Sequence, residues 1–375
     1  MINNRAVVPV ISISRVVPTV LMALTILLSA CSDSSSTPDA GFAGLGETSS
    51  DNFRQPSVDD VISLPQDLGV HPQHRIEWWY LTANLKTADG RSLGLQWTQF
   101  RRGLKAAASV DQPQTDWNMN AAWMSHAAVS VDGEHRFSER LARGGTRQAG
   151  ATGQPFNVWL DDWQLREVDG SKEQWQLTVT EDNWSYNLLI APRRDIVRHG
   201  QDGFSTKSAD GQGSMYFSFV DLAIEGDVTL DGETYAVSGQ GWFDREWSSQ
   251  FLRADQDGWD WLALHLDSGA KVMAFRLRER DGFYQSGTWV SPTGEVRALT
   301  PDQLSLEPGR LRDTRAGSLP EQWQLSIPSE GLDITVTVPP GDYWNNGVFP
   351  YWESPVSAEG THKGVGYLEL TGYQE

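Results

Sequence analysis

The 375-residue chain contains a single cysteine, and this scarcity excludes two classes of protein. One thiol cannot form a disulfide framework within the chain, and it cannot supply a cysteine-based zinc or iron–sulfur site. Basic residues are also few, because 30 Lys and Arg stand against 49 Asp and Glu, for a formal net charge of -19. Nucleic acids are bound through clustered positive charge, so the composition excludes a nucleic-acid partner.

Long apolar runs are missing after the first thirty residues. Residues 1–30 contain two arginines, no acidic residue and an apolar run from Val16 to Leu28, which is typical of a secretory signal peptide rather than of a membrane span. The run ends in Leu-Ser-Ala-Cys at Cys31. This ending resembles the lipobox of bacterial lipoproteins, in which the cysteine sulfur takes a diacylglyceryl group. We therefore predict that a lipidated Cys31 anchors the protein to a membrane; an ordinary signal peptide with an incidental cysteine is the alternative.

Residues 31–58 are predicted to form a flexible tether, because their many Ser, Asp and Gly residues cannot bury enough apolar surface to fold. Several acyl chains on one cysteine suffice for stable anchoring. The residue after the cysteine is Ser32, and in lipoproteins a residue other than Asp at this position favours the outer membrane. We expect an outer-membrane lipoprotein that faces the periplasm, with the choice of membrane and leaflet left open.

From Arg75 onward, short apolar or aromatic runs alternate with turn residues, and no long helical periodicity occurs. The dipeptide Asp-Gly occurs eight times, and it favours the tight turn of a two-residue β-hairpin. The chain is also rich in aromatic residues, with 17 Trp, 9 Tyr and 13 Phe, which suit strands and ligand pockets. These features predict an all-β barrel or sandwich.

An internal repeat predicts the number of domains. The segment WWYLTANL at 78–85 aligns with WDWLALHL at 259–266, and each precedes a glycine turn and another strand-like run. The segment GQGWFD at 239–244 aligns with GVGYLE at 364–369, so a carboxylate has the same offset in both. Two related β-barrels explain these matches, and chance similarity of strand-rich segments is the alternative. The predicted domains are residues 59–250 and 251–375.

Several motifs resemble those of the AttH-like family, which includes the carotenoid 1,2-hydratases (hydroxyneurosporene synthases) and many secreted proteins described as predicted hydrolases. The motifs occur in order between His71 and Tyr373, nearly the whole mature chain. They are Glu77–Tyr80, Gln99–Arg101, Ser125–Ala127, Gly239–Trp247, Gly258–Trp261, Tyr351–Glu353 and Gly366–Tyr373. The resemblance implies two tandem lipocalin-like antiparallel β-barrels, and a barrel of this kind implies a hydrophobic small molecule or lipid as ligand.

The motif WFDREW carries the candidate catalytic residues. Strand alternation places Trp242, Asp244 and Glu246 on one face. If this face points inward among aromatic side chains, burial favours the neutral form of a carboxyl, which could then protonate an alkene or hold a water for addition. Together with the resemblance to the hydratases, this pattern makes Asp244 the candidate acid, with Glu246 beside it and Trp242 and Tyr216 lining the pocket. The alternative is an ion-pair network in which the Asp-Arg-Glu triplet joins the two barrels.

Further side chains complete the predicted ligand site. Trp261 and His265 fall on one face of the expected strand at 259–266, and Asp260 falls on the other. His265 and His126 each have two interpretations, as a hydrogen-bonded core histidine or as a base that lines the pocket. The predicted ligand-binding residues are Trp242, Tyr216, Trp79, His126, Asp260, Trp261 and His265.

Other chemistries lack their sequence signals. The sequence has no Gly-x-Ser-x-Gly elbow of a serine hydrolase and no phosphate-binding glycine loop. His71, His74 and Glu77 lack a helix to align them as metal ligands, so we expect neither a metal nor a cofactor. Three functions remain open: a carrier of a hydrophobic small molecule or lipid, an enzyme of the hydratase or cyclase type that uses Asp244, and a periplasmic accessory protein of an ABC-type permease. The last follows from the family resemblance, since AttH-like proteins are named for association with a transporter.

Overall fold

The computed structural model describes residues 53–106, 120–169, 171–250, 252–253 and 255–374, together with Met1. The predicted signal peptide, Cys31 and most of the predicted tether therefore lie outside the described residues. The described residues from Phe53 onward belong to one compact unit. Within these ranges, no helix is both long enough and apolar enough to cross a membrane.

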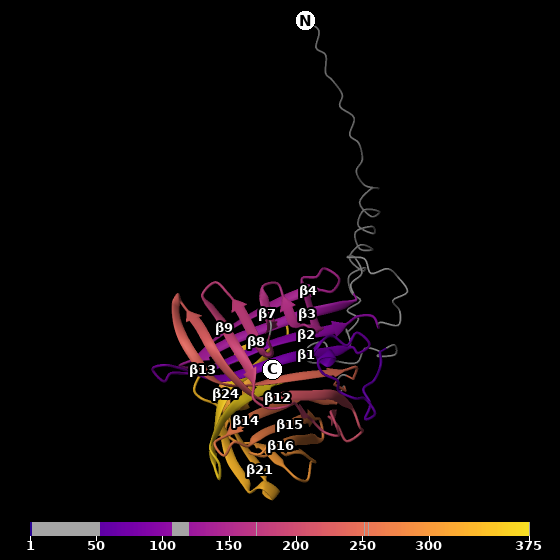
Figure 1. Cartoon of the computed structure of the whole chain (residues 1–375), viewed down its shortest axis with the longest axis vertical. Helices are drawn as coiled ribbons and strands as arrows, with labels where there is room; N and C mark the ends of the chain where they lie inside the picture. The colour runs from indigo at the N-terminus through magenta and orange to yellow at the C-terminus, as the bar shows by residue number, and fades with distance from the viewer. Residues whose placement is uncertain (2–52, 107–119, 170, 251, 254, 375) are drawn as a thin grey trace. The chain divides into compact units, whose positions relative to one another are not determined.

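Regular structure in the described ranges is almost entirely β-strand, which confirms the predicted all-β class. Two large antiparallel sheets curl into barrel-like folds, and Figure 1 shows β1 to β4 side by side in indigo and purple and β14 to β16 side by side in orange. The strands of the first sheet are β1 (Ile76–Thr87), β2 (Ser92–Gly103), β3 (Ala121–Val131), β4 (Glu134–Arg143), β5 (Ala149–Gly153), β6 (Phe156–Leu160), β7 (Trp163–Val168), β8 (Ser171–Thr180), β9 (Trp184–Pro192), β10 (Val197–Arg198), β11 (Phe204–Thr206), β12 (Gly213–Leu230) and β13 (Glu233–Ser248). Those of the second are β14 (Gln256–Leu266), β15 (Lys271–Glu279), β16 (Gly282–Val290), β17 (Val296–Leu299), β18 (Ser305–Pro308), β21 (Gln322–Ile327), β22 (Leu332–Thr337), β23 (Trp344–Asn345), β24 (Tyr351–Gly360) and β25 (Gly364–Leu370).

Three minor elements complete the described fold. A separate hairpin is formed by β19 (Leu311–Thr314) and β20 (Gly317–Pro320), and two short 3-10 helices cover Gln66–Leu68 and Pro328–Glu330. The strands change from one large sheet to the other between β13 and β14, within one compact unit. The division into two domains near residue 250 therefore stays a prediction.

Asp-Gly pairs form tight hairpin turns, as their sequence predicts. Asp132 and Gly133 connect β3 to β4 with φ angles of 52° and 84°, and Asp231 and Gly232 connect β12 to β13 with φ angles of 52° and 86°. Two successive positive φ angles define the turn whose twist matches that of antiparallel strands, and only Gly, Asn and Asp adopt them readily. These turns fix the register of the strands that they join.

The two sheets share a central arrangement of four strands. The order β2-β1-β13-β12 in the first sheet is matched by β15-β14-β25-β24 in the second. In each case the first strand of the repeat pairs with a strand from the end of the same half. The segments aligned in the sequence repeat thus occupy corresponding positions in the two sheets.

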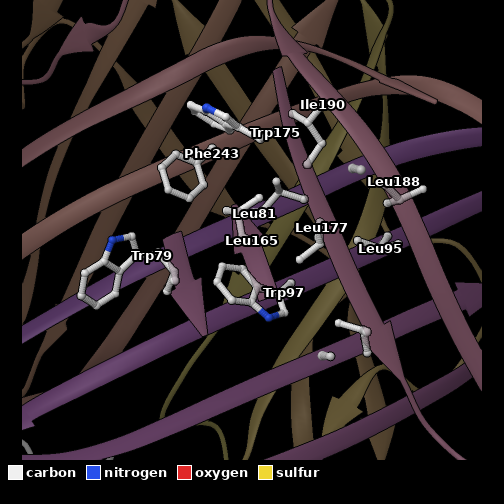
Figure 2. Close-up of a cluster of buried hydrophobic side chains, with 14 of the residues drawn as sticks. Trp79, Leu81, Leu95, Trp97, Leu165, Trp175, Leu177, Leu188, Ile190 and Phe243 are labelled. Atoms are coloured by element: carbon white, nitrogen blue, oxygen red, sulfur yellow. The ribbon is translucent and has the colours of Figure 1, made fainter. Parts of the chain in front are cut away.

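The interior of the first sheet is filled by apolar side chains from many strands. Trp79, Trp97, Trp175 and Phe243 gather there with aliphatic side chains, as Figure 2 shows. A second buried cluster occupies the interior of the other sheet. A third cluster includes Tyr80 and Trp242 from the first sheet and Trp261 and Phe275 from the second, so the two sheets pack against each other through apolar faces.

Candidate functional site

The cavity that carries the candidate site lies between the two sheets. Its volume is about 410 Å³, and its walls come mainly from β1, β2, β3, β12 and β13 of the first sheet and β14, β15 and β25 of the second. This size is ordinary for a small-molecule site. Apolar and aromatic side chains form most of the walls. The aromatic ones are Trp78, Tyr80, Phe100, Trp123, Tyr216, Trp259, Trp261, Phe275, Phe349 and Tyr351.

The position of this cavity differs from the expected one. The lipocalin resemblance implied a ligand inside a barrel, whereas the interior of the first sheet is occupied by the side chains of Figure 2. A close-packed interior leaves few voids larger than a water molecule. Tyr80 and Asp244 line the cavity, while their chain neighbours Trp79 and Phe243 point into the packed interior. The outer faces of β1 and β13 therefore form the cavity wall.

Asp244 is the central polar group of the first wall. Its side chain projects from β13, and the residue is only 3% exposed. The Trp242 indole donates a hydrogen bond to Oδ1 at 2.6 Å, and the Ser218 hydroxyl donates to the same oxygen. Burial raises the pKa of Asp244 to about 7, although these hydrogen bonds and one with Tyr216 oppose the rise. A carboxyl that retains its proton near neutral pH can act as a general acid.

A buried histidine, His199, is linked to Asp244 through the hydroxyl group of Ser218. His199 Nε2 lies 2.6 Å from the Ser218 hydroxyl oxygen, and His199 Nδ1 lies 2.8 Å from the Thr288 hydroxyl oxygen. The imidazole stacks on Tyr216 with 4.0 Å between ring centroids, and burial holds the pKa of His199 well below its usual range. A neutral His199 therefore orients the hydroxyl that bonds to Asp244. Neither His199 nor Ser218 belongs to a sequence motif, and so neither was predicted.

Glu246 shares the face of Asp244 but has a different environment. Its Oε1 lies 3.2 Å from the Lys207 ammonium nitrogen and accepts a hydrogen bond from Ser214. The same ammonium lies over two aromatic rings, 4.7 and 4.5 Å from their centroids. A cation therefore balances the charge of Glu246, whereas hydrogen-bond donors surround Asp244.

The second sheet supplies a carboxyl pair to the other wall. Glu369 on β25 lines the cavity, and the Trp259 indole donates a hydrogen bond to its Oε1. Glu353 on β24 is the register partner of Glu369, and Tyr80 of the first sheet donates to Glu353 Oε2 at 2.8 Å. Burial raises the pKa of Glu369 to about 7, and burial together with the nearby Glu369 raises the pKa of Glu353 well above its usual range. Two adjacent buried carboxyls hold a proton between them rather than ionise together.

Asp244 and Glu369 occupy equivalent places in the two halves. Tyr80 is the register partner of Asp244 across β1 and β13, and Trp261 is the register partner of Glu369 across β14 and β25. The sequence repeat aligns both pairs. Glu369 was not among the predicted site residues, yet the same alignment could have identified it.

Five of the predicted site residues line the cavity, namely Asp244, Glu246, Tyr216, His126 and Trp261. His126 bonds through Nδ1 to the Tyr351 hydroxyl at 2.8 Å and through Nε2 to Glu139 at 2.9 Å. Burial lowers the pKa of His126. Both ring nitrogens are engaged, so His126 has the geometry of a hydrogen-bonded wall residue rather than of a free base.

Trp79 and Asp260, both predicted to bind ligand, lie outside the cavity lining. Trp79 points into the interior of the first sheet, where its indole donates to the Leu68 carbonyl oxygen at 2.7 Å. Asp260 is buried away from the cavity and forms ion pairs with Arg276 and Arg278. Their role in ligand binding stays a prediction. Strand periodicity separates two faces, but it does not say which face meets a cavity.

Trp242 and His265 each face the other sheet, and neither is among the residues that line the cavity. Their ring centroids lie 6.0 Å apart, and His265 Nε2 lies 3.0 Å from the Val220 carbonyl oxygen. Burial lowers the pKa of His265 to about 4. Both side chains pack behind the wall, and Trp242 affects the cavity through its hydrogen bond to Asp244.

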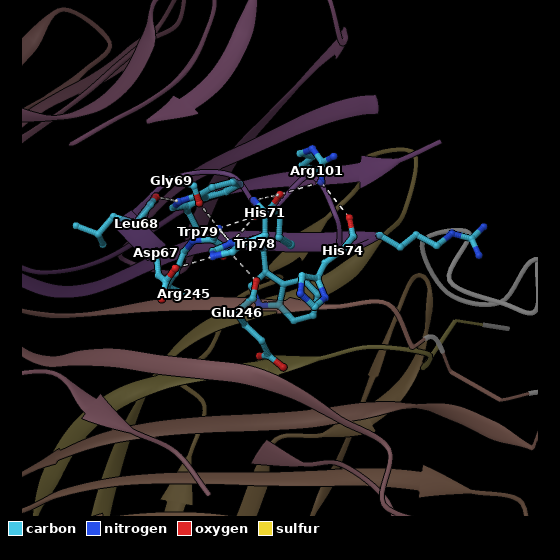
Figure 3. A network of polar contacts seen from close by, with 12 residues as sticks. Asp67, Leu68, Gly69, His71, His74, Trp78, Trp79, Arg101, Arg245 and Glu246 are labelled. Carbon is cyan, nitrogen blue, oxygen red and sulfur yellow. Dashed lines mark hydrogen bonds and ion pairs between the residues drawn. The ribbon is translucent and has the colours of Figure 1, made fainter. Parts of the chain in front are cut away.

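Arg245 does not join the two sheets. Its side chain is fully buried inside the first sheet, 3.9 Å above the Trp79 ring centroid, and it forms an ion pair with Glu77. It also donates to the Gly69 carbonyl oxygen (Figure 3), and Arg101 pairs with the other oxygen of Glu77 at 2.8 Å. The interpretation of the Asp-Arg-Glu triplet as a bridge between barrels is therefore wrong. Its basic and acidic members lie on opposite faces of β13.

The fold and the site define a class of protein. Two curled antiparallel sheets of the lipocalin kind hold an apolar cavity between them, and buried carboxyl groups line both walls. In the described ranges, no three His, Cys, Asp or Glu side chains are grouped to hold a metal ion. The chain belongs to the AttH-like family, which matches residues 55–373.

Two solved structures are similar to this chain. An AttH protein from Nitrosomonas europaea shares 30% sequence identity, with a TM-score of 0.76 and coverage of 86% of this chain and 100% of that chain. Kievitone hydratase from Nectria haematococca shares 15% identity, with a TM-score of 0.62 and coverage of 85% of this chain and 96% of that chain. The second likeness shows a common fold alone. Among curated proteins, none matches the chain. The predicted family and fold are thus confirmed.

Proposed function

We propose that this protein binds a hydrophobic small molecule in the cavity between its sheets and adds water to a carbon–carbon double bond of that molecule. One observation carries the proposal. Asp244 is a buried carboxyl in the wall of an aromatic cavity, held by hydrogen-bond donors rather than by a basic side chain. Its pKa of about 7 leaves the proton available near neutral pH.

The cavity walls suit the chemistry of such an addition. Proton transfer from Asp244 to an alkene carbon creates a carbocation at the other carbon, and water then adds to that centre. Aromatic faces stabilise a cation by the quadrupole of the ring, and Tyr216, Trp259 and Trp261 supply such faces. The likeness in fold to a kievitone hydratase supports the choice of hydration among acid-catalysed reactions, although fold alone does not define function.

The decisive comparison is between the wild type and Asp244→Asn. Kievitone and other phenols with a 3-methylbut-2-enyl chain serve as probes, and mass spectrometry detects a product heavier by one water. We expect the wild type to hydrate at least one probe and Asp244→Asn to lose about 10²-fold or more of the rate, as is usual when a general acid is removed. Asp227→Asn is the matched control, because Asp227 is an exposed carboxylate on β12.

Two outcomes would change this conclusion. Equal hydration by wild type and Asp244→Asn would remove Asp244 from the chemistry. Stable retention of a probe by both proteins without conversion would instead favour a carrier that uses the same cavity. Organic extraction of the protein purified from its native source, followed by mass spectrometry, identifies any ligand retained in that case.

Cys31 is the proposed site of membrane attachment, and the proposed location is the periplasmic face of the outer membrane. The support is the lipobox-like ending of residues 28–31. Metabolic labelling with an alkyne fatty acid should mark the wild type and leave Cys31→Ser unlabelled and in the aqueous phase of a detergent partition. Labelling of Cys31→Ser would contradict the assignment. The association with an ABC-type permease remains a prediction from the family resemblance.

A further inference from the structure

Glu369 places a carboxyl group on the cavity wall that the other sheet builds. It lines the same cavity as Asp244 and occupies the equivalent register position. Its Oε1 accepts a hydrogen bond from the Trp259 indole, and no ion pair holds it among the described residues. Glu246, by contrast, is paired with Lys207. Glu369 is therefore the carboxyl of the second wall that remains available to a ligand.

The addition of water needs two groups that handle protons. One group gives a proton to carbon, and another removes a proton from the water that attacks the cation. When the water attacks the cation from the face opposite Asp244, a base on the other wall of the cavity takes its proton. Two carboxyls from equivalent positions of the two sheets can supply both the proton donor and the base.

We propose that Glu369 is the base that takes a proton from the attacking water, and that Glu353 and Tyr80 hold it in place. This assignment rests on the proposed hydration. In the step, the π bond of the alkene and the O–H bond of the Asp244 carboxyl break while a C–H bond forms. A C–O bond to water forms next, and one O–H bond of that water breaks as its proton passes to the Glu369 carboxylate. Exchange with solvent returns Glu369 to the carboxylate and Asp244 to the acid, so the net change is the addition of one water.

The contacts around Glu353 explain how Glu369 is positioned. Tyr80 donates to Glu353 Oε2 at 2.8 Å, and Glu353 Oε1 is buried without a hydrogen-bond donor among the described residues. A neutral Glu353 carries its proton on that oxygen and directs it to its register partner Glu369. Because Tyr80 comes from the first sheet, its hydrogen bond joins the register partner of Glu369 to the wall that holds Asp244.

The test compares Glu369→Gln with the wild type on whichever prenylated phenol the wild type hydrates. We expect kcat to fall about 10²-fold with KM nearly unchanged, because the base is lost while the apolar walls remain. We expect Glu353→Gln to lower kcat less and to shift the acidic limb of the pH profile. Glu359→Gln is the matched control, since Glu359 is an exposed carboxylate on the same strand as Glu353.

The pH profile separates a base from a merely structural residue. A reaction that needs a protonated Asp244 and an ionised Glu369 gives a bell-shaped rate profile, and Glu369→Gln should remove its acidic limb. Near-ultraviolet circular dichroism confirms that each variant keeps its packed aromatic side chains. Full activity with an unchanged profile in Glu369→Gln would overturn the base assignment and leave the hydration by Asp244 standing. Absence of hydration by the wild type with every probe would overturn both.

Discussion

The two faces of β1 and β13 carry buried acids of opposite character. On the interior face, Glu77 lies between Arg101 and Arg245. Burial alone would raise the pKa of Glu77, but the two guanidinium groups and His71 hold it well below its usual range. On the cavity face, no ion pair holds Asp244 among the described residues, and burial raises its pKa to about 7. The same pair of strands thus holds an ionised carboxylate on one face and a carboxyl that keeps its proton on the other. Both side chains are buried, so the nearby guanidinium groups explain why the two pKa values shift in opposite directions.

The largest loss of stability is expected when the buried carboxylate of Glu77 is removed. Glu77→Gln leaves Arg245 fully buried without its carboxylate, and loss of one partner from a buried ion pair costs about 3–5 kcal/mol of unfolding free energy. Urea unfolding measures the loss. Glu225→Gln, which alters an exposed carboxylate on β12, should change stability by less than about 0.5 kcal/mol. Equal effects of the two substitutions would show that the buried network does not stabilise the fold.

Truncation of apolar side chains tests a second difference between the two faces, because the interior of the first sheet is filled and the other face borders a cavity. Leu177→Ala removes a fully buried side chain from the interior of the first sheet and should cost about 2–5 kcal/mol. Met124→Ala alters a partly exposed residue of the cavity wall, where the added space joins a void that already exists. We expect a smaller loss of stability and a change in the binding of the fluorescent probe N-phenyl-1-naphthylamine. A larger loss for Met124→Ala would contradict the assignment of filled and open faces.

The last prediction concerns a change of stability with pH that comes from the proton on Asp244. Its ordinary pKa is 3.8 and its pKa in the fold is about 7, so between these values the unfolded chain ionises while the folded carboxyl stays protonated. Stability therefore falls as pH rises through this range, by up to about 1.4 kcal/mol per pH unit. Asp244→Asn should remove this slope. The difference in unfolding free energy between wild type and variant, measured from about pH 4 to pH 7, cancels the parallel contribution of Glu369. A difference that does not vary with pH would place the pKa of Asp244 in its ordinary range.

Local features of this protein were readable from the sequence. Alternation correctly separated Asp244 from Arg245 and Asp260 from Trp261, because a strand has a strict period of two. Asp-Gly marked hairpin turns such as that at Asp132, because few residues accept two successive positive φ angles. Strand alternation and turn type depend only on neighbouring residues, so they can be predicted from the sequence.

The location of the cavity was not readable in this way. Both faces of β1 are apolar, with Trp78 and Tyr80 on one side and Trp79 and Leu81 on the other, so hydrophobicity does not say which face meets a ligand. The answer depends on how the second sheet packs against the first. For the same reason, the pairing of Glu77 with a distant arginine followed from the assembled fold and not from the spacing of residues.

Hydrogen bonds between the sheets have a consequence for the synthesis of the protein. Tyr80 reaches Glu353 at 2.8 Å and Trp261 reaches Tyr216 at 3.2 Å, so each wall is held by residues translated long before or after its own. A nascent chain that ends before β14 presents the apolar face around Tyr216 to water, which invites aggregation. In that state the second sheet does not cover the face that carries Asp244, so the burial that raises the pKa of Asp244 in the complete fold is reduced.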